Sequence, residues 1–216
     1  MQAKKARERT RPTFTESARR AQIITAAIGA FAELGYARTS FAKIAQRAGL
    51  SSTGMISYHF AGKDDVVRAC FTEIMAVTTD FMKPRIDAAT GHAAKLRAYI
   101  ESNVELLRAH PGHVRALVEM IGNAKDADGR PIGDTSVLTG RVGLFEAHLR
   151  AGQQAGEFTD FDPRVMAIAI TGAIDALVGA HTGTDGGLDL DRCGRELADT
   201  FQRATGPTPH EPEEQA

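Results

Sequence analysis

The stretch that decides the fold runs from Thr39 to Lys63 and reads TSFAKIAQRAGLSSTGMISYHFAGK. In its first part, apolar residues recur at i, i+3, i+4 and i+7, the pattern of one face of a short helix. These residues are Phe41, Ile44, Ala45 and Ala48. Ser40 is placed to cap the first turn, and Gly49 is a residue type at which helices end. The pattern therefore predicts a short helix that begins after Ser40 and stops at Gly49.

A second short helix follows after three hydroxyl residues, Ser51 to Thr53, which offer N-caps. Its apolar residues Met55 and Ile56 can pack against the first helix and leave the polar residues beside them reachable. Two short helices joined by a glycine turn make a helix-turn-helix. Small polar residues at the start of the second helix can approach a groove floor closely, and flanking lysines and arginines suit phosphates. This combination predicts DNA recognition.

The same residues resemble the DNA-binding domain of the TetR family of bacterial transcriptional regulators. The matching runs are GYARTSFAKIAQRAGL at 35–50 and GMISYHFAGKDDV at 54–66. This sequence departs from the family pattern in two places. The segment between Gly49 and Gly54 is one residue longer, and Ser57 stands where many members have a tyrosine. The resemblance implies a homodimeric transcriptional regulator, most often a repressor, that releases a pseudo-palindromic operator in double-stranded DNA when a small-molecule effector binds.

The expected DNA contacts fall into two groups. Residues expected to face base edges are Ser52, Thr53, Gly54, Met55 and Ser57. Residues expected to position the phosphate backbone are Thr39, Ser40, Lys43, Tyr58, His59 and Lys63. Thr39 caps a helix in the plainest interpretation, and the resemblance adds a phosphate contact there.

The charge distribution supports a nucleic-acid partner for the N-terminal third. Residues 1–70 contain 12 Lys and Arg against 5 Asp and Glu, whereas residues 71–216 contain 14 against 22. A basic segment of this kind suits a polyanion, and the net charge of −1 for the whole chain conceals it.

Other classes of protein receive little support from the sequence. Cys70 and Cys193 form no CxxC or Cys/His spacing, so neither a zinc site nor a disulfide framework is expected. Motifs such as GxSxG and HExxH are missing, so we expect no enzymatic activity, no metal and no cofactor. The first 20 residues lack the apolar core of a signal sequence, and the apolar run 165–180 is short and interrupted by polar residues. A cytoplasmic protein without a membrane span is expected.

The helical periodicities predict an all-α chain, with an N-terminal three-helix helix-turn-helix domain followed by a C-terminal helical bundle for ligand binding and dimerisation. The expected divisions are a basic disordered arm at 1–13, the DNA-binding domain at 14–62, the regulatory and dimerisation domain at 63–205, and a disordered tail at 206–216. The arm is either a solvated tail or a segment that adds phosphate or minor-groove contacts. A long helix from Lys63 to Pro84 is expected to link the two domains.

The helix expected at 163–181 is apolar around its whole circumference, which indicates burial on more than one side and hence a homodimer. Small residues would let a partner helix approach: Ala169, Gly172, Ala173, Ala176 and Gly179. The last helix, with Leu190, Cys193, Leu197 and Phe201 on one side, is expected to complete the interface. Two-fold symmetry would place two recognition helices about 34 Å or somewhat more apart, in successive major grooves.

An effector pocket in a helical bundle is mostly apolar, with a few polar groups directed inward. The candidate polar residues are Asn103, Glu119, His148 and Asp175. The candidate apolar lining is Phe71, Met75, Tyr99, Met120, Phe145 and Met166. Each of these can equally be an ordinary core or helix-edge residue. Two rival functions are an architectural DNA-binding protein without an effector and a helical-bundle enzyme; the basic N-terminal segment argues against the enzyme.

Overall fold

The computed structural model describes residues 13–126, 128–132, 136–183 and 187–206, and leaves the side chains of 136–139 undescribed. Within these ranges the chain is helical, apart from loops and one isolated bridge between Lys125 and Pro131, and the all-α prediction is confirmed. The expected basic arm and tail lie outside these ranges, except for residues 13 and 206. The helices are α1 Phe14–Leu34, α2 Phe41–Arg47, α3 Gly54–His59, α4 Lys63–Ala88, α5 His92–Ala109, α6 Pro111–Asn123, α7 Ser136–Gln154, α8 Pro163–Gly183 and α9 Leu190–Thr205.

Local sequence signals set the ends of the first two helices. At the start of α1, Thr13 and Glu16 form a capping box: the Thr13 hydroxyl accepts from the Glu16 amide, and the Glu16 carboxylate accepts from the Thr13 amide. The helix ends at Gly35, whose φ of 78° lies in the region that favours glycine. Ser40 caps α2 by accepting from the amide of Lys43.

Two predicted boundaries were wrong. The hydroxyls before α3 were expected to cap it, but Thr53 has helical backbone angles and its side chain makes no capping hydrogen bond. The long helix was expected to stop at Pro84, yet α4 continues to Ala88. Proline removes only one amide donor, and Pro84 lies on the exposed side of the helix near its end, where that loss is tolerated.

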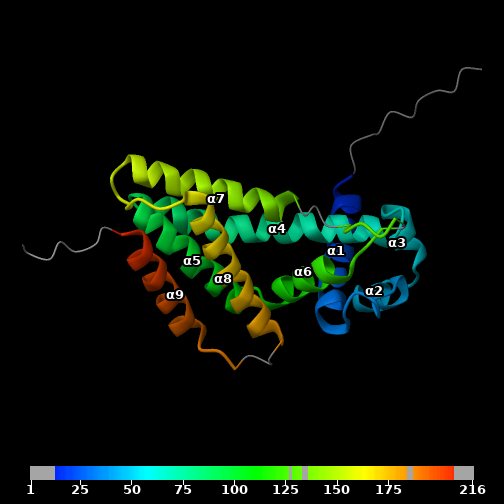
Figure 1. Ribbon diagram of the computed structural model, residues 1–216. Coiled ribbons are helices and arrows are strands. Elements are labelled where there is room, and N and C mark those ends of the chain that lie inside the picture. Colours follow the sequence, from blue (N-terminus) through cyan, green and yellow to red (C-terminus); the bar gives the residue numbers. More distant parts are fainter. Residues whose placement is uncertain (1–12, 127, 133–135, 184–186, 207–216) are drawn as a thin grey trace, which may run out of the picture.

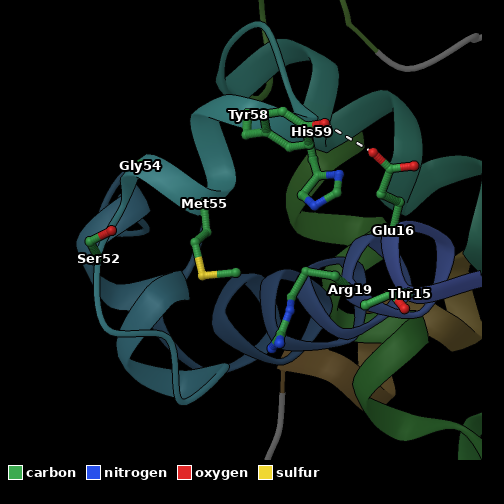
Figure 2. Close-up of a pocket in the computed structure, with 8 residues that line it drawn as sticks. All are labelled: Thr15, Glu16, Arg19, Ser52, Gly54, Met55, Tyr58 and His59. Carbon is green, nitrogen blue, oxygen red and sulfur yellow. Dashed lines mark hydrogen bonds between the residues drawn. The ribbon is translucent and has the colours of Figure 1, made fainter. Parts of the chain in front are cut away.

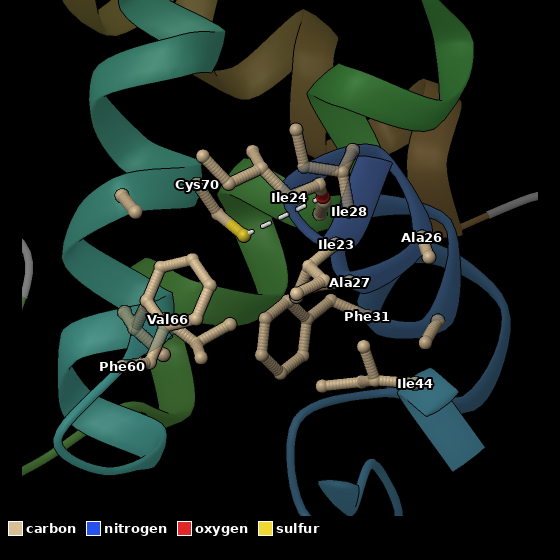
Figure 3. Close-up of a cluster of buried hydrophobic side chains, with 14 of the residues drawn as sticks. Ile23, Ile24, Ala26, Ala27, Ile28, Phe31, Ile44, Phe60, Val66 and Cys70 are labelled. Carbon is tan, nitrogen blue, oxygen red and sulfur yellow. Dashed lines mark hydrogen bonds between the residues drawn. The ribbon is translucent and has the colours of Figure 1, made fainter. Parts of the chain in front are cut away.

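One hydrophobic core holds the DNA-binding domain together and fastens it to the rest of the chain (Figure 3). Phe31 from α1, Ile44 from α2 and Phe60 after α3 are at most 2% exposed and meet in this core. The same core includes Val66 and Cys70 of α4 and also Ala116 and Met120 of α6. The first turns of α4 and the C-terminal part of α6 therefore belong structurally to the DNA-binding domain.

The C-terminal bundle has its own core, and α4 runs along the molecule between the two (Figure 1). Its buried residues come from α5, α7, α8 and α9, with Phe158 from the loop before α8: Leu96, Ile100, Phe145, Leu149, Phe158, Ala167, Ile170, Ile174, Ala198 and Phe201. The apolar side of α9 was expected to face a partner subunit. Instead Phe201 is buried here, and Leu190 and Leu197 pack against cores of the same protomer.

One face of α8 remains uncovered. Val165 and Ile168 are 63% and 52% exposed. The small residues Ala169, Gly172, Ala176 and Gly179 are exposed along the same helix, whereas Ala173 is half-buried against the bundle. By length and composition α8 could also cross a membrane, although core helices of soluble proteins satisfy the same criterion. The exposed apolar strip is the surface expected of an interface helix.

Candidate nucleic-acid interface

The second helix of the helix-turn-helix, α3, is attached to the domain through one of its faces. Ile56 is fully buried and Phe60, directly after the helix, is 2% exposed. Because these two residues are fixed in the core, the opposite face of the helix points outward. Gly54, Ser57 and Tyr58 are exposed on the helix, as are Ser52 and Thr53 just before it, while Met55 and His59 are half-buried. All of these are residues that we expected to contact DNA.

A shallow pocket separates α3 from the start of α1 (Figure 2). It is lined by Thr15, Glu16, Arg19, Ser52, Gly54, Met55, Tyr58 and His59. Tyr58 is 73% exposed, and its ring packs edge-on against His59, with 5.0 Å between the ring centroids. The Tyr58 hydroxyl donates to the Glu16 carboxylate at 2.9 Å, so α1 orients the aromatic end of α3.

Glu16 and Arg19 are residues of this surface that sequence reasoning missed. The capping box predicts where Glu16 lies on α1, but nothing local indicates that α3 returns to the same place. The amide of Thr13 and the hydroxyl of Tyr58 both donate to Glu16 and lower the pKa of its carboxyl. The same hydrogen bond raises the pKa of Tyr58, so a carboxylate and a neutral phenol face each other here.

On α2, Ser40 and Lys43 are exposed as expected. Arg47, at the end of the same helix, has its guanidinium paired with both carboxylate oxygens of Glu33, at 2.6 and 2.7 Å. This pairing raises the pKa of Arg47 and balances its charge. Lys43 is therefore better placed than Arg47 to meet a phosphate.

The structure corrects the expectation for Thr39. Its side chain is 2% exposed, and its hydroxyl lies 2.8 Å from the Gly35 carbonyl oxygen and 3.1 Å from that of Ala30. The hydroxyl hydrogen is therefore used within the protein, where it joins the end of α1 to the start of α2. A side-chain phosphate contact from Thr39 is not available in this conformation.

Tyr36 is held by side chains from α4 and α6. The ammonium of Lys63, the first residue of α4, donates to the Tyr36 carbonyl at 2.6 Å and lies 3.9 Å from the centre of its ring. The Tyr36 amide donates to the Glu119 carboxylate of α6 at 3.2 Å. Burial lowers the pKa of Lys63. An ammonium carries three N–H groups, so a phosphate contact from Lys63 stays a prediction compatible with its present bond.

The residues predicted to bind an effector do not form one site. Glu119 holds the turn after α1, and Met75 and Met120 pack in the core of the DNA-binding domain. Phe71 is buried in α4, and the Nε2 of His148 lies 3.0 Å from the carbonyl oxygen of His92. These five residues thus have contacts within the protein, and their ligand contacts stay predictions.

The other predicted effector residues belong to the bundle. The rings of Tyr99 and Phe145 lie 4.3 Å apart, the Asn103 amide donates to the Tyr99 carbonyl, and Met166 packs against the same core. Asp175 pairs with Arg141, a residue that we had not singled out. No group of three His, Cys, Asp or Glu side chains that could hold a metal occurs in the described part of the chain.

Comparisons with known proteins agree with this geometry. Residues 23–70 match the family model described as "Bacterial regulatory proteins, tetR family". The HTH-type transcriptional regulator BetI of Burkholderia mallei is 35% identical over 91 residues. That match covers 40% of this chain and 45% of BetI, so the chain aligns with about half the length of this curated relative.

The solved structures extend the likeness to the whole fold. The fatty acid degradation regulator FadR from Bacillus halodurans aligns with a TM-score of 0.75 and 25% identity, over 89% of this chain and 97% of its own. FadR from Bacillus subtilis, solved in complex with stearoyl-CoA, aligns with a TM-score of 0.72 and 26% identity, over 84% and 96% of the two chains. Both domains of this chain therefore have counterparts in these regulators.

Proposed function

We propose that this chain, whose residues 23–70 match the model of the tetR family, is a homodimeric, ligand-responsive transcriptional repressor. The observation that carries the proposal is the outward face of α3. Small polar residues and an exposed tyrosine stand there, on a helix fixed from behind by Ile56 and Phe60. A short helix of this kind can enter a major groove while Ser40, Lys43 and Lys63 meet the phosphates.

The exposed strip of α8 supports the dimer. Val165 and Ile168 supply apolar surface, and the glycines and alanines beside them allow close approach of a second helix. Two copies related by a two-fold axis would present two α3 helices to a pseudo-palindromic operator. In this arrangement the partner covers an apolar surface that the protomer alone leaves in water.

Two features favour an effector-responsive regulator over an architectural DNA-binding protein. The relatives are named as regulators, and FadR from Bacillus subtilis was solved with stearoyl-CoA. In addition, α4 and α6 pack in the core of the DNA-binding domain and also, through Phe81 and Val114, against α5 of the bundle, so a shift in the bundle can move α3. A coupling of about 1–3 kcal/mol is typical of such switches. We place the protein in the cytoplasm and assign it no enzymatic role.

Genomic footprinting on DNA from the source organism, at two salt concentrations, tests the DNA-binding role. A Cβ at Gly54 would make only ordinary contact, 3.4 Å from the Ser52 hydroxyl oxygen, so Gly54→Asp is expected to fold. An aspartate there faces the phosphates with a negative charge, and Gly54→Asn is its neutral control. Discrete palindromic sites that disappear with aspartate and weaken less with asparagine support the proposal. Diffuse coverage that salt removes would instead favour the architectural function.

The oligomeric state tests the α8 interface. Nothing lies within 4 Å of a Cβ added at Gly172 on α8 or at Gly122 on α6, so each position can hold an arginine within the protomer. Light scattering after size-exclusion chromatography should give a dimer for the wild type and for Gly122→Arg, and a monomer for Gly172→Arg. A dimer that survives Gly172→Arg would place the interface elsewhere.

A further inference from the structure

Arg141 of α7 is a half-buried cation whose hydrogen-bonding capacity is only partly used. Its side chain is 23% exposed, and its Nη2 donates to both carboxylate oxygens of Asp175, at 2.7 and 2.6 Å. The Nε of the same guanidinium is buried, and it has no hydrogen-bond partner among the atoms that the structure describes. One nitrogen therefore serves two oxygens while its neighbour has none.

This arrangement differs from the pairing that a guanidinium and a carboxylate prefer. In a bidentate pair, Nε and Nη2 each donate to a separate oxygen along one edge of the guanidinium. Burying a hydrogen-bond donor without an acceptor costs free energy, so this edge of the Arg141 guanidinium is suited to bind an anion that is better aligned than the Asp175 carboxylate. Asp175 is 58% exposed, and its carboxylate can move to water at little cost when such an anion arrives.

The surroundings of Arg141 combine a second polar group with apolar walls. The ring of Tyr99 packs on Phe145 in the bundle core, and its hydroxyl lies beside Arg141 and Asn103. Burial raises the pKa of Tyr99, so the hydroxyl keeps its proton and can donate to an anion. An anion on Arg141 would thus meet a second donor, and a chain or ring attached to it would meet apolar side chains.

We propose that Arg141 and Tyr99 bind the head group of the effector, and that the effector is an amphipathic carboxylate with one negative charge and an apolar body. This inference rests on the effector-responsive role proposed above and names the chemical class of the ligand. One guanidinium balances one charge, which suits a carboxylate better than a dianionic phosphate. In the absence of effector, Asp175 occupies the place of the carboxylate.

The test uses the full chain without DNA, with decanoate and 4-phenylbutyrate as probes and the corresponding alcohols as uncharged controls. Isothermal titration should show that each carboxylate binds at least about tenfold more tightly than its alcohol, because only the anion pairs with Arg141. Arg141→Met should abolish this preference, whereas Arg150→Met, which alters an exposed arginine on the same helix, should leave it unchanged. Equal affinity of acids and alcohols, or a preference that survives Arg141→Met, would overturn the proposal.

Asp175→Asn separates a ligand site from a purely structural ion pair. This variant keeps Arg141 and removes the competing charge, so carboxylates should bind several-fold more tightly than to the wild type. If the ion pair only stabilises the fold, the variant lowers the melting temperature without any gain in affinity, and the proposal fails. These titrations contain no DNA, so a negative result would refute the carboxylate site without affecting the interpretation of the footprints. Diffuse footprints would likewise refute the specific DNA-binding role without affecting the titrations.

Discussion

Glu119 offers the sharpest test of how the two parts of the molecule are joined. Its carboxylate accepts the Tyr36 amide across 83 residues of sequence and lies against Gly35, where α1 ends. The Asn123 side chain also approaches it, at 3.3 Å. Removing the carboxylate by Glu119→Ala leaves a half-buried amide without its partner, at the point where α6 supports the DNA-binding domain.

The expected loss follows from the geometry. A hydrogen bond to a charged group contributes about 1.5–3 kcal/mol to stability. This bond is 3.2 Å long and only partly buried, so about 1–2 kcal/mol is expected for Glu119→Ala. For a chain of this size, each kcal/mol shifts the melting temperature by about 2–4 °C. The melting temperature should therefore fall by about 2–8 °C.

Thermal unfolding followed by circular dichroism measures this loss, with Glu119→Gln as the matched control. Glu119→Gln keeps an oxygen acceptor and removes the charge, so its loss of stability should be less than half of the loss in Glu119→Ala. If glutamine and alanine lose the same amount, charge rather than the hydrogen bond is responsible. If alanine melts within about 1 °C of the wild type, Glu119 does not fasten α6 to α1, and the reasoning is refuted.

Three further outcomes are expected. Gly152→Ala should lower the free energy of unfolding by about 1–3 kcal/mol in chemical denaturation, because the added Cβ would lie 2.2 Å from the Phe158 ring. In the control Gly143→Ala, on the same helix, the added Cβ meets nothing within 4 Å and should not destabilise the protein. Burial raises the pKa of Cys70 to about 12, so this thiol should resist iodoacetamide at pH 8 until the protein unfolds, while the half-exposed Cys193 reacts first. Mass spectrometry distinguishes the two cysteines. Early labelling of Cys70 would contradict its burial in the core. Burial lowers the pKa of His148 below 6.5, so as the pH drops through about 6.5 the unfolded chain is protonated before the folded one and the free energy of unfolding falls. His148→Gln should reduce this acid sensitivity in unfolding titrations. An unchanged pH profile would show that His148 is not its source.

Local chemistry made much of the DNA-binding domain predictable. The capping box at Thr13, the glycine at 35 and the N-cap at Ser40 each act within a few residues, and Ser40 caps its helix as expected. The apolar run also indicated the helix expected at 163–181, which the structure has as Pro163–Gly183. Pro84 was misjudged, because the pattern could not show that the helix is exposed there and tolerates the lost bond.

Contacts between distant segments could not be read from spacing. Thr39 carries the same hydroxyl whether it faces DNA or the Gly35 carbonyl, and only the packing of α1 on α2 decides which. Glu119 and Asp175 both interrupt apolar helices, yet one holds the turn at Tyr36 and the other pairs with Arg141. The side of α9 that the sequence marks as apolar turned out to face its own bundle.

By itself, the sequence determined the helical class, the helix-turn-helix and the surface of α3, because these depend on periodicity, caps and turns that act over a few residues. Only the tertiary structure decided which polar side chains are free to meet a ligand. The free energy of a buried polar group depends on partners supplied by other helices, and sequence spacing does not specify those partners. Arg141 and Tyr99 come together for that reason, although 42 positions separate them in the chain.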